Sequence, residues 1–319
     1  MQAIRLHTHG GPEVLRLEDV PAPVPQAGEV LVRVAAAGIN FIDTYQRAGL
    51  YPVTLPCVPG SEGVGVVAQD AGEFKAGERV LWVAQPGSYA EQVAVPAGKL
   101  VRVPDGLGDT DAVAAGLQAL TAQFLADSIG DVQAGDATLV HAGAGGVGLL
   151  LIQLLKRRGA RVLTTVSTAE KAALARAAGA DEVILYTQAD FVAAVKAATD
   201  GKGVKVAYDS VGKTTALGSL SVVRLLGTLV LYGQSSGVVP PIDPLALMRQ
   251  GSIFLTRPTL FHYIAEAGSL QQRAARVFGL VKDGSLKLRV GHEYPLAAAA
   301  QAHTELEARQ TTGKLVLRM

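Results

Sequence analysis

Residues 138–148 read Thr-Leu-Val-His-Ala-Gly-Ala-Gly-Gly-Val-Gly, and an apolar run follows at once. A short apolar segment thus leads into glycines with the spacing G-x-G-x-x-G, at Gly143, Gly145 and Gly148. In this pattern the first glycine makes a tight turn, the second lets the backbone approach a pyrophosphate, and the third lets helix and strand pack closely. The N-terminus of the following helix offers unpaired N–H groups and a partial positive charge to phosphates. The stretch therefore predicts a dinucleotide-binding turn.

Strand and helix signals alternate from this turn onward. Six strands with helices between them predict a doubly wound parallel sheet of the Rossmann type. The predicted strands are Thr138–His141, Arg161–Val166, Glu182–Leu185, Val204–Tyr208, Thr228–Tyr232 and Ile253–Thr256, and the predicted helices are Leu149–Arg158, Glu170–Ala178, Phe191–Ala198, Thr214–Val223 and Pro244–Gln250.

The rest of the chain follows other patterns. The first hundred residues hold short β-branched runs bounded by glycine and proline, which predict a β-rich domain. Helical spacing begins near Asp111 and continues to Ala126. A long amphipathic helix over Tyr263–Lys282, a strand at Leu286–Val290 and a helix at Pro295–Ala308 are predicted next. The last strand, Lys314–Leu317, is too short to stand alone and is expected to join the sheet of the first domain.

Composition excludes several classes of protein. The 319 residues suffice for about two domains, and 49% of them are apolar while 18% are charged. A net charge of +1 without a basic run argues against a dedicated nucleic-acid binder. Cys57 is the one cysteine, so neither an intramolecular disulfide nor a thiolate metal cluster is expected. The N-terminus lacks a signal-peptide pattern and no segment approaches ~18 uninterrupted apolar residues, so a cytoplasmic protein is expected.

The end of the second Rossmann strand bears on the cofactor. An acidic side chain about 20 residues past the fingerprint would hydrogen-bond an unphosphorylated ribose. Residues 163–171 read Leu-Thr-Thr-Val-Ser-Thr-Ala-Glu-Lys, with no acid at the strand end. Ser167 and Thr168 can donate to a 2′-phosphate, and Lys171 can supply a positive charge one helical turn later. The pattern favours NADPH, although Ser167-x-x-Glu170 also fits a capping box that needs no ligand.

Further motifs lie along essentially the whole chain. They are Gly-Ile-Asn-Phe-Ile-Asp-Thr-Tyr-Gln-Arg-Ala-Gly-Leu-Tyr at 38–51, Pro-Gly-Ser-Glu-Gly-Val-Gly at 59–65, the glycine turn, Tyr-Asp-Ser-Val-Gly at 208–212 and Thr-Arg-Pro-Thr at 256–259. In these motifs the chain resembles the zinc-independent quinone oxidoreductases of the medium-chain dehydrogenase/reductase superfamily, the group that contains zeta-crystallin. The resemblance implies a β-rich, GroES-like catalytic domain of residues 1–120 and 257–319, an NADPH-binding Rossmann domain of residues 121–256, and a site in the cleft between them.

The resemblance also bears on zinc. In the zinc alcohol dehydrogenases of the same superfamily, a cysteine takes the place of Asn40 and a histidine takes the place of Ser61. Asparagine and serine are poor zinc ligands beside thiolate and imidazole. Without a metal an alcohol is not readily ionised, whereas a quinone or conjugated enone is already electrophilic. The expected activity is therefore metal-free, NADPH-dependent reduction of a quinone.

The resemblance places the nicotinamide near Asn40, Tyr45 and Tyr51, which are the predicted catalytic residues. Tyr45 and Tyr51 are candidate donors to negative charge growing on oxygen, because a phenol stays protonated at neutral pH, and Asn40 would orient cofactor or substrate. Simpler roles stay open: Tyr45 could only pack in the seam between domains, and Asn40 could be a plain helix N-cap. Asp43, at the third position of the same helix, suits a dipole-compensating carboxylate better than a general acid.

Contacts with NADPH are carried over from the family position by position. Gly146 and Val147, within the turn, should cradle the pyrophosphate, and Arg309 is a candidate for the 2′-phosphate that could equally be a solvated helix-end residue. The predicted cofactor-binding residues are Phe41, Asp43, Thr121, Gly143, Gly145, Gly146, Val147, Gly148, Ser167, Lys171, Tyr186, Ser210, Tyr232, Gly233, Gln234, Ser235 and Arg309.

Two alternative functions remain open, and one partner is expected. The first alternative is an NADPH-dependent reductase of α,β-unsaturated aldehydes or ketones, which the sequence barely separates from quinone reduction. The second is a structural or RNA-binding protein, as zeta-crystallin exemplifies, although near-neutral charge disfavours it. A homodimer is expected by resemblance, with Ile253–Thr256 at an exposed sheet edge. His141 is expected to orient or pack near the turn, and the scattered histidines predict no metal site.

Overall fold

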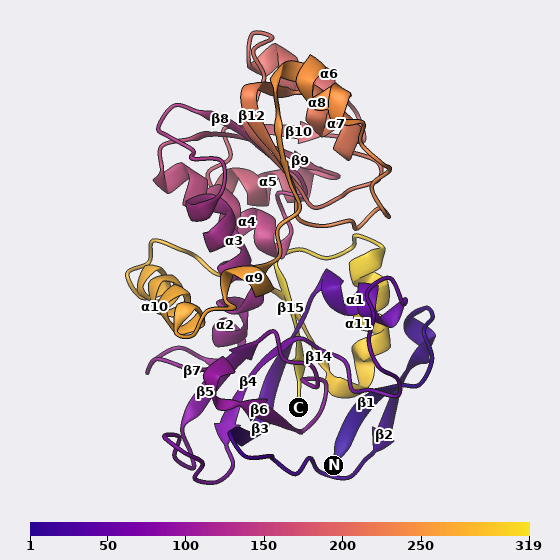
Figure 1. Ribbon diagram of the computed structural model, residues 1–319, viewed down its shortest axis with the longest axis vertical. Coiled ribbons are helices and arrows are strands. Elements are labelled where there is room, and N and C mark those ends of the chain that lie inside the picture. Colours follow the sequence, from indigo (N-terminus) through magenta and orange to yellow (C-terminus); the bar gives the residue numbers. More distant parts are fainter. The chain divides into compact units, whose positions relative to one another are not determined.

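The computed structural model describes residues 1–319, which fall into two compact units (Figure 1). Unit 1 comprises Met1–Leu120 and Tyr263–Met319, and unit 2 comprises Thr121–His262. Each unit has its own large sheet. The assignment of catalysis to one domain and cofactor binding to the other stays a prediction. No helix has the length and apolar character needed to span a bilayer.

Unit 2 contains the predicted doubly wound sheet. Its strands are all parallel and follow the order β10-β9-β8-β11-β12-β13, which confirms this part of the fold. The order reverses beside β8, the strand that leads into the glycine turn, and ligands of such sheets bind at this point. The elements are β8 (Ala137–Val140), α4 (Gly146–Arg157), β9 (Arg161–Val166), α5 (Ala169–Ala177), β10 (Glu182–Leu185), α6 (Phe191–Ala198), β11 (Val204–Asp209), α7 (Ala216–Ser221), β12 (Val223–Leu231), α8 (Pro244–Gly251) and β13 (Phe254–Thr256).

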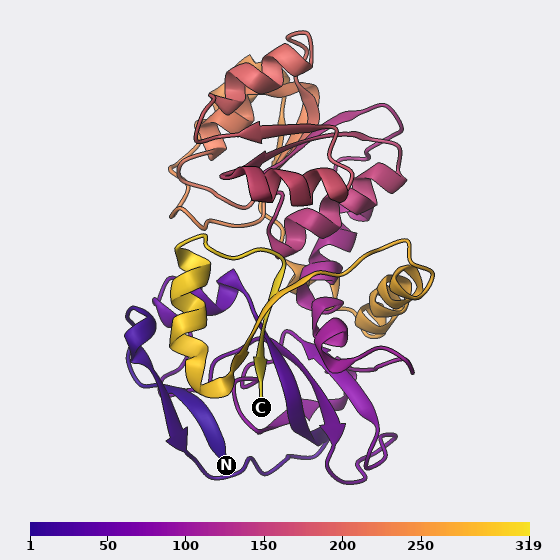
Figure 2. The same cartoon turned by 180° about the vertical axis from the view of Figure 1, so that it is seen from behind.

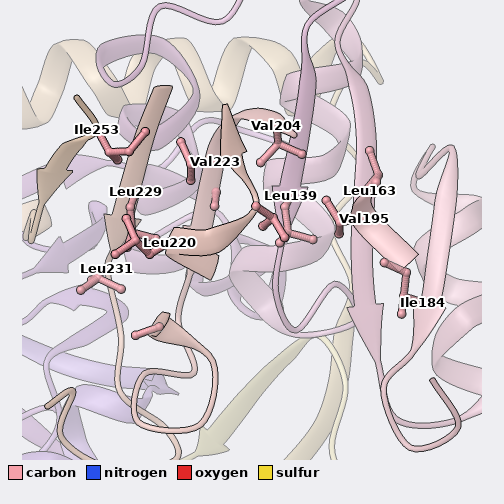
Figure 3. Packing of buried hydrophobic residues seen from close by; sticks show 13 residues of the cluster. Leu139, Leu163, Ile184, Val195, Val204, Leu220, Val223, Leu229, Leu231 and Ile253 are labelled. Carbon is pink, nitrogen blue, oxygen red and sulfur yellow. The ribbon is translucent and has the colours of Figure 1, made fainter. Parts of the chain in front are cut away.

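Apolar side chains from the strands and covering helices form the core of unit 2 (Figure 3). Leu139, Leu163 and Leu229 come from the parallel strands β8, β9 and β12, while Val195 and Leu220 come from α6 and α7. Helices cover a parallel sheet on both faces, so its strands read as continuous apolar runs rather than alternating ones. This core fixes the strand ends at which the glycine turn and its neighbours lie.

Unit 1 is built on antiparallel pairing. Its main sheet has the order β14-β15-β3-β4-β5-β7, with β6 also paired to β3, and β1 and β2 form a separate ribbon. Its elements are β1 (Gln2–Leu6), η1 (Pro12–Val14), β2 (Leu15–Asp19), β3 (Glu29–Ile39), α1 (Phe41–Arg47), β4 (Glu62–Val67), β5 (Arg79–Val83), β6 (Gln92–Pro96), η2 (Ala97–Lys99), β7 (Leu100–Arg102), α2 (Asp109–Ala114), α10 (Ser269–Lys282), β14 (Val290–Pro295), η3 (Leu296–Ala298), α11 (Ala299–Glu307) and β15 (Lys314–Arg318). Helices α3 (Leu117–Ser128) and α9 (Leu260–Tyr263) each contain a boundary between the units.

The C-terminal strand joins the sheet of the first domain, as predicted. β15 lies inside the sheet, parallel to β14 and antiparallel to β3. The pairing Leu315–Ile39 brings the C-terminal strand to the end of β3, one residue before Asn40. In both views α11 lies beside α1, although the two helices come from opposite ends of the chain (Figures 1 and 2). The C-terminal segment therefore forms part of the surroundings of α1.

Two predicted elements after residue 260 are wrong in their bounds. The long helix predicted over Tyr263–Lys282 begins only at Ser269, as α10, after the left-handed N-cap Gly268 (φ 81°), and Tyr263 instead ends α9. The strand predicted at Leu286–Val290 lies later, at β14. Leu286 is buried, but its N–H donates to Leu280 O at the end of α10, so its apolar character reflects packing rather than strand pairing.

The predicted helical stretch from Asp111 to Ala126 is also divided, into α2 and α3 with a break at Gly116. A Cβ at Gly116 would collide with the Glu62 carboxylate, so the break makes room for a buried acid. Helix α7 is shorter than predicted because Val223 already belongs to β12. Apolar spacing marked these regions correctly as ordered, but it did not reveal where a buried group interrupts them.

The placement of β15 predicts unequal costs for two matched substitutions in unit 1. Val316 is fully buried in β15, whereas Val24 is 77% exposed. We expect Val316→Ala to lower the free energy of unfolding by about 2 kcal/mol, through lost burial and the cavity left behind. Val24→Ala should change it by less than about 0.5 kcal/mol. Urea unfolding followed by circular dichroism measures both, and equal midpoints would contradict an interior position of β15.

Candidate active site

The Asn40–Tyr51 segment begins at the end of β3 and enters α1. Asn40 is the N-cap residue with extended backbone (φ −137°, ψ 158°), and Asp43 occupies the third helical position. The backbone N–H of Asn40 donates to Asp43 Oδ2 at 2.8 Å, and the backbone N–H of Asp43 donates to Asn40 O at 3.0 Å. These reciprocal bonds fix the start of the helix and thereby the position of Asn40.

A buried ion pair holds the Asn40 side chain. Lys314, the first residue of β15, forms an ion pair with Glu62, and its Nζ also donates to Asn40 Oδ1 at 3.1 Å. Asn40 Nδ2 donates to Glu62 Oε1 at 2.7 Å, so both ends of the amide are specified. The second Glu62 oxygen accepts the backbone N–H of Leu117 at 2.6 Å, at the start of α3. All three side chains are at most 5% exposed.

The Asp43 carboxylate is enclosed by donors. Ser61 Oγ donates to Asp43 Oδ1 at 2.7 Å, and Tyr89 OH donates to Oδ2 at 3.3 Å, in addition to the bond from Asn40. Burial raises the pKa of the Asp43 carboxyl to about 6, against the lowering effect of the Ser61 and Asn40 hydrogen bonds and the Lys314 charge. Asp43 stays a predicted cofactor contact, but its carboxylate is fully buried and bonded within the protein.

A chain of polar side chains continues from Asp43 to α11. Arg47 is 3% exposed and donates from Nη1 to His303 Nδ1 at 3.2 Å and from Nη2 to Glu307 at 2.8 Å. A guanidinium cannot accept a hydrogen bond, so His303 carries its proton on Nε2 and donates to the Tyr89 oxygen at 3.1 Å. Burial, with the Arg47 charge, lowers the pKa of His303 to about 3, which keeps it neutral.

The predicted aromatic residues meet on the outer side of α1. The Tyr45 and Tyr51 rings have centroids 5.3 Å apart at 64°, and the Phe41 and Tyr45 rings are 6.1 Å apart. Tyr51 N–H donates to Tyr45 O at 3.2 Å, which turns the chain after the helix and brings the second phenol back. All three rings are half-buried, so the structure gathers two of the predicted catalytic residues into one aromatic cluster.

The glycine turn differs from expectation at one position. The left-handed residue is Ala142 (φ 55°) rather than Gly143. Gly143 is needed for another reason, since a Cβ there would collide with Thr164 of β9. A Cβ at Gly148 would collide with Ala142 O, which fits the expected close packing of helix on strand. Gly145 is the N-cap of α4, and a Cβ there would lie 3.2 Å from Ala142 O, close to the helix N–H groups.

The predicted cofactor contacts of unit 2 follow the carboxyl ends of neighbouring parallel strands and so share one edge of the sheet. Backbone bonds join two of the loops, because Ser235 N–H donates to Ser210 O at 3.2 Å. Gly143–Gly148 follow β8, Ser167 and Lys171 follow β9, Tyr186 follows β10, Ser210 follows β11, and Tyr232, Gly233, Gln234 and Ser235 follow β12. Thr121 lies on α3, and Arg309 lies in unit 1 just after α11 with φ 59°.

Ser167 is not the N-cap of the helix after β9, so the capping box expected from Ser167 and Glu170 does not form. Helix α5 begins at Ala169, and its N-cap is Thr168, whose hydroxyl accepts the Lys171 N–H at 3.3 Å. Ser167 lies one residue earlier and its carbonyl accepts the Thr187 hydroxyl at 3.0 Å. Helix capping therefore accounts for Thr168 and leaves the choice of serine at 167 unexplained by local structure.

Sequence reasoning did not find Lys314, Glu62, Tyr89 or the pair Arg47 and His303. Lys314 was part of a predicted strand, and a charged residue opening an otherwise buried strand was the available signal. Glu62 stood inside a quoted motif without a role of its own. The structure brings together no group of three or more His, Cys, Asp or Glu side chains suited to hold a metal ion.

Comparisons with known proteins show which family the chain resembles. Family models described as alcohol dehydrogenase GroES-like domain and zinc-binding dehydrogenase match residues 26–105 and 178–317. The chain is 43% identical to a quinone oxidoreductase of Pseudomonas aeruginosa, with 98% of each chain covered. It is 40% identical to a 2-haloacrylate reductase of a Burkholderia species, with 99% of this chain and 98% of the relative covered.

Comparison with a solved structure shows that the backbone fold is similar as well. The Escherichia coli quinone oxidoreductase complexed with NADPH superposes with a TM-score of 0.96 at 38% identity, and all of each chain is covered. Similarity of this extent over the full length includes both the β-rich sheet and the Rossmann sheet. The chain therefore belongs to the quinone oxidoreductase family of the medium-chain dehydrogenase/reductase superfamily.

Proposed function

We propose that this protein is an NADPH-dependent quinone reductase that works without a metal. The observation that carries the proposal is the full-length likeness to quinone oxidoreductases, one of which was solved with NADPH. Asn40 and Ser61, which stand where the zinc alcohol dehydrogenases have a cysteine and a histidine, are engaged by Lys314, Glu62 and Asp43. An amide and a hydroxyl in such contacts are weak ligands for zinc.

The strand ends of unit 2 suit a phosphorylated dinucleotide. The N-terminus of α4 and the small residues before it leave backbone N–H groups for a pyrophosphate. The end of β9 carries Ser167 and then Lys171, and no acidic side chain stands where one would repel a 2′-phosphate. We infer that the turn binds the pyrophosphate, and that Ser167, Lys171 and Tyr186 bind the 2′-phosphate end.

When bound, NADPH supplies the reducing hydride, and unit 1 supplies the groups that act on the acceptor. We propose that the phenols of Tyr45 and Tyr51, whose ring centroids lie 5.3 Å apart, donate hydrogen bonds to an oxygen that gains negative charge during reduction. Asn40 orients its ligand, because Lys314 and Glu62 fix which end of its amide is oxygen and which is nitrogen. These roles follow from donor chemistry and fixed position, without proton transfer from Asp43.

A second candidate substrate has its own support. The 2-haloacrylate reductase relative is nearly as similar as the quinone oxidoreductase, at 40% identity. A haloacrylate is a conjugated acceptor, so the same donors would stabilise charge on its carboxyl oxygen after hydride addition to the alkene. Reduction of α,β-unsaturated aldehydes or ketones is therefore our second proposal for this site.

The exposed edge of unit 2 supports a proposed homodimer. Strand β13 pairs only with β12, and large apolar side chains are exposed on both strands and on α8. An unpaired edge beside an apolar surface is a frequent site of strand pairing between copies. The exposed side chains are Leu225, Leu226, Leu245, Met248, Phe254 and Leu255. We also propose a cytoplasmic location, since a lone cysteine suits a reducing compartment.

Initial rates of NADPH and NADH oxidation, measured with a quinone and with an alkenal, test the proposed function. We expect a higher kcat/KM for the quinone, a preference for NADPH, and the same rate after exhaustive chelation. A higher kcat/KM for the alkenal would favour the second proposal. Activity that disappears on chelation and returns with zinc would overturn the metal-free mechanism.

Removal of one phenol should separate catalysis from cofactor binding. Tyr51→Phe is expected to lower kcat by about tenfold or more, because one donor to the developing charge is lost, while the Kd for NADPH stays unchanged. Tyr294→Phe is the matched control, since the Tyr294 hydroxyl bonds Glu305 at 2.6 Å in β14 and α11. Its kcat should equal that of the wild type. An unchanged kcat for Tyr51→Phe would remove this phenol from the mechanism.

The buried carboxyl of Asp43 predicts a pH dependence of stability. Its pKa rises from 3.8 to about 6 on folding, so its contribution is complete below pH 4 and is lost as pH rises through 6. The shift corresponds to about 3 kcal/mol. His303 acts oppositely, because its pKa falls from 6.5 to about 3 and its contribution grows as pH rises over that range.

We therefore compare the free energy of unfolding of the wild type with that of Asp43→Asn. The loss caused by the substitution should be smaller at pH 7 than at pH 4, by about 3 kcal/mol. His303 titrates in both proteins and cancels from this difference. Urea unfolding at the two pH values measures it. A difference in unfolding free energy that is the same at both values would show that Asp43 does not take up a proton in the folded state.

A further inference from the structure

We infer that His141 is a positioning residue for the cofactor: its buried imidazole ties together the bases of three loops that the proposed function assigns to NADPH. The inference rests on that proposed function for the identity of the ligand. His141 follows the last residue of β8, and Ala142 with the glycine turn comes next. Its side chain is 1% exposed, so it acts through neighbours rather than by touching a ligand.

The imidazole bonds one side chain on each side of β8. His141 Nδ1 lies 2.8 Å from Thr165 Oγ1, near the end of β9. His141 Nε2 lies 2.9 Å from Ser219 Oγ on α7. The Phe191 ring packs edge-on against the imidazole, with the two ring centroids 4.9 Å apart. Because β9 and β11 flank β8 in the sheet, one ring reaches toward both neighbouring strand ends.

The direction of every bond in this network is determined. Ser219 Oγ donates to Asp209 Oδ2 at 2.7 Å, so the serine oxygen accepts the proton on His141 Nε2. His141 Nδ1 is then the acceptor of the Thr165 hydroxyl. Burial lowers the pKa of His141, against the opposing effect of the Asp209 charge, and a neutral ring satisfies all of these contacts. Each hydroxyl and the ring N–H therefore donates one hydrogen bond within the network, and only this set of directions satisfies all of the contacts.

The Asp209 end of the network shapes the loop after β11. Asp209 Oδ1 accepts the backbone N–H groups of Val211 at 2.8 Å and Gly212 at 3.0 Å, and the Thr215 hydroxyl at 2.9 Å. The loop that contains Ser210 therefore wraps around a buried carboxylate. The position of this carboxylate is set on its other oxygen by Ser219, the partner of His141.

The Thr165 end returns to the glycine turn. Thr165 O accepts the Gly143 N–H at 3.1 Å, while its hydroxyl bonds His141. Ser167 follows two residues later, so the same strand end sets the turn and the proposed 2′-phosphate site. Between His141 and Gly143, Ala142 holds a left-handed backbone (φ 55°) that is strained for a residue with a Cβ. Such a conformation persists only where its surroundings hold it, as this network does.

Three conservative variants of the network test the inference. Thr165→Val and Ser219→Ala each remove a hydroxyl from the network, and we expect each to raise the Kd for NADPH by about three- to tenfold. The kcat at saturating NADPH should stay within about twofold of the wild type, since the acceptor groups lie elsewhere. Thr165→Ser keeps the hydroxyl and should restore the wild-type Kd.

Thr199→Val is the matched control. Thr199 is also buried, and its hydroxyl donates to Val195 O at 2.8 Å and accepts the Gly203 N–H at 3.0 Å. These contacts precede the start of β11, whereas Asp209 is at its other end. It should lower the melting temperature without changing the Kd for NADPH. Titration by NADPH fluorescence and thermal unfolding supply both readouts for all four variants.

The inference is overturned if Thr165→Val and Ser219→Ala lower the melting temperature as Thr199→Val does but keep the wild-type Kd. It is equally overturned if Thr165→Ser fails to restore the affinity that Thr165→Val loses while both are folded. Failure of the proposed function would be distinct, because the wild-type protein itself would then show no binding of NADPH in the first titration.

Discussion

The buried ion pair between Lys314 and Glu62 is the interaction on which the geometry of the active-site segment depends. Removing either partner of a buried pair leaves a charge without compensation, at a cost of about 3–5 kcal/mol. Here the pair also specifies the orientation of the Asn40 amide and binds the first N–H of α3. The break at Gly116 and the closeness of Gly38 to both charged groups show how the backbone is adapted to them. A hydrophobic replacement of similar volume would fill the space but could not orient an amide.

Unit 1 thus contains two kinds of buried polarity. The ion pair carries balanced charges, whereas the chain from Asp43 through Tyr89 and His303 to Arg47 is ordered by hydrogen-bond direction. Because Arg47 cannot give up its proton, the chain positions groups rather than conducting protons. In unit 2 the polar side chains around His141 are likewise ordered by hydrogen-bond direction. In both units a neutral imidazole joins elements distant in sequence, and the groups proposed to meet the ligand lie at the ends of those elements.

The sequence sufficed for the doubly wound parallel sheet, because strand periodicity and glycine spacing are local signals. It failed where the cause was a contact distant in sequence. The break at Gly116 depends on Glu62, and Lys314 acts on Asn40 from the other end of the chain. The helix predicted from Tyr263 starts only after Gly268, because apolar spacing continues across a residue whose backbone lies outside the helical region. Tertiary hydrogen bonds such as Asp43–Ser61 leave no periodic signature, so only the fold reveals them.

The position of β15 has a consequence for how the chain matures during synthesis. The ribosome releases the N-terminal part of unit 1 first, then the whole of unit 2, and Lys314 only after unit 2. Unit 2 is a continuous segment whose contacts can form as it emerges, whereas β3 waits for a partner strand from the far end of the chain. Until then Glu62 has no counter-charge and Asn40 no fixed orientation. The surroundings of Asn40 are therefore completed only after β15 has been synthesised, when every strand of the parallel sheet has already emerged.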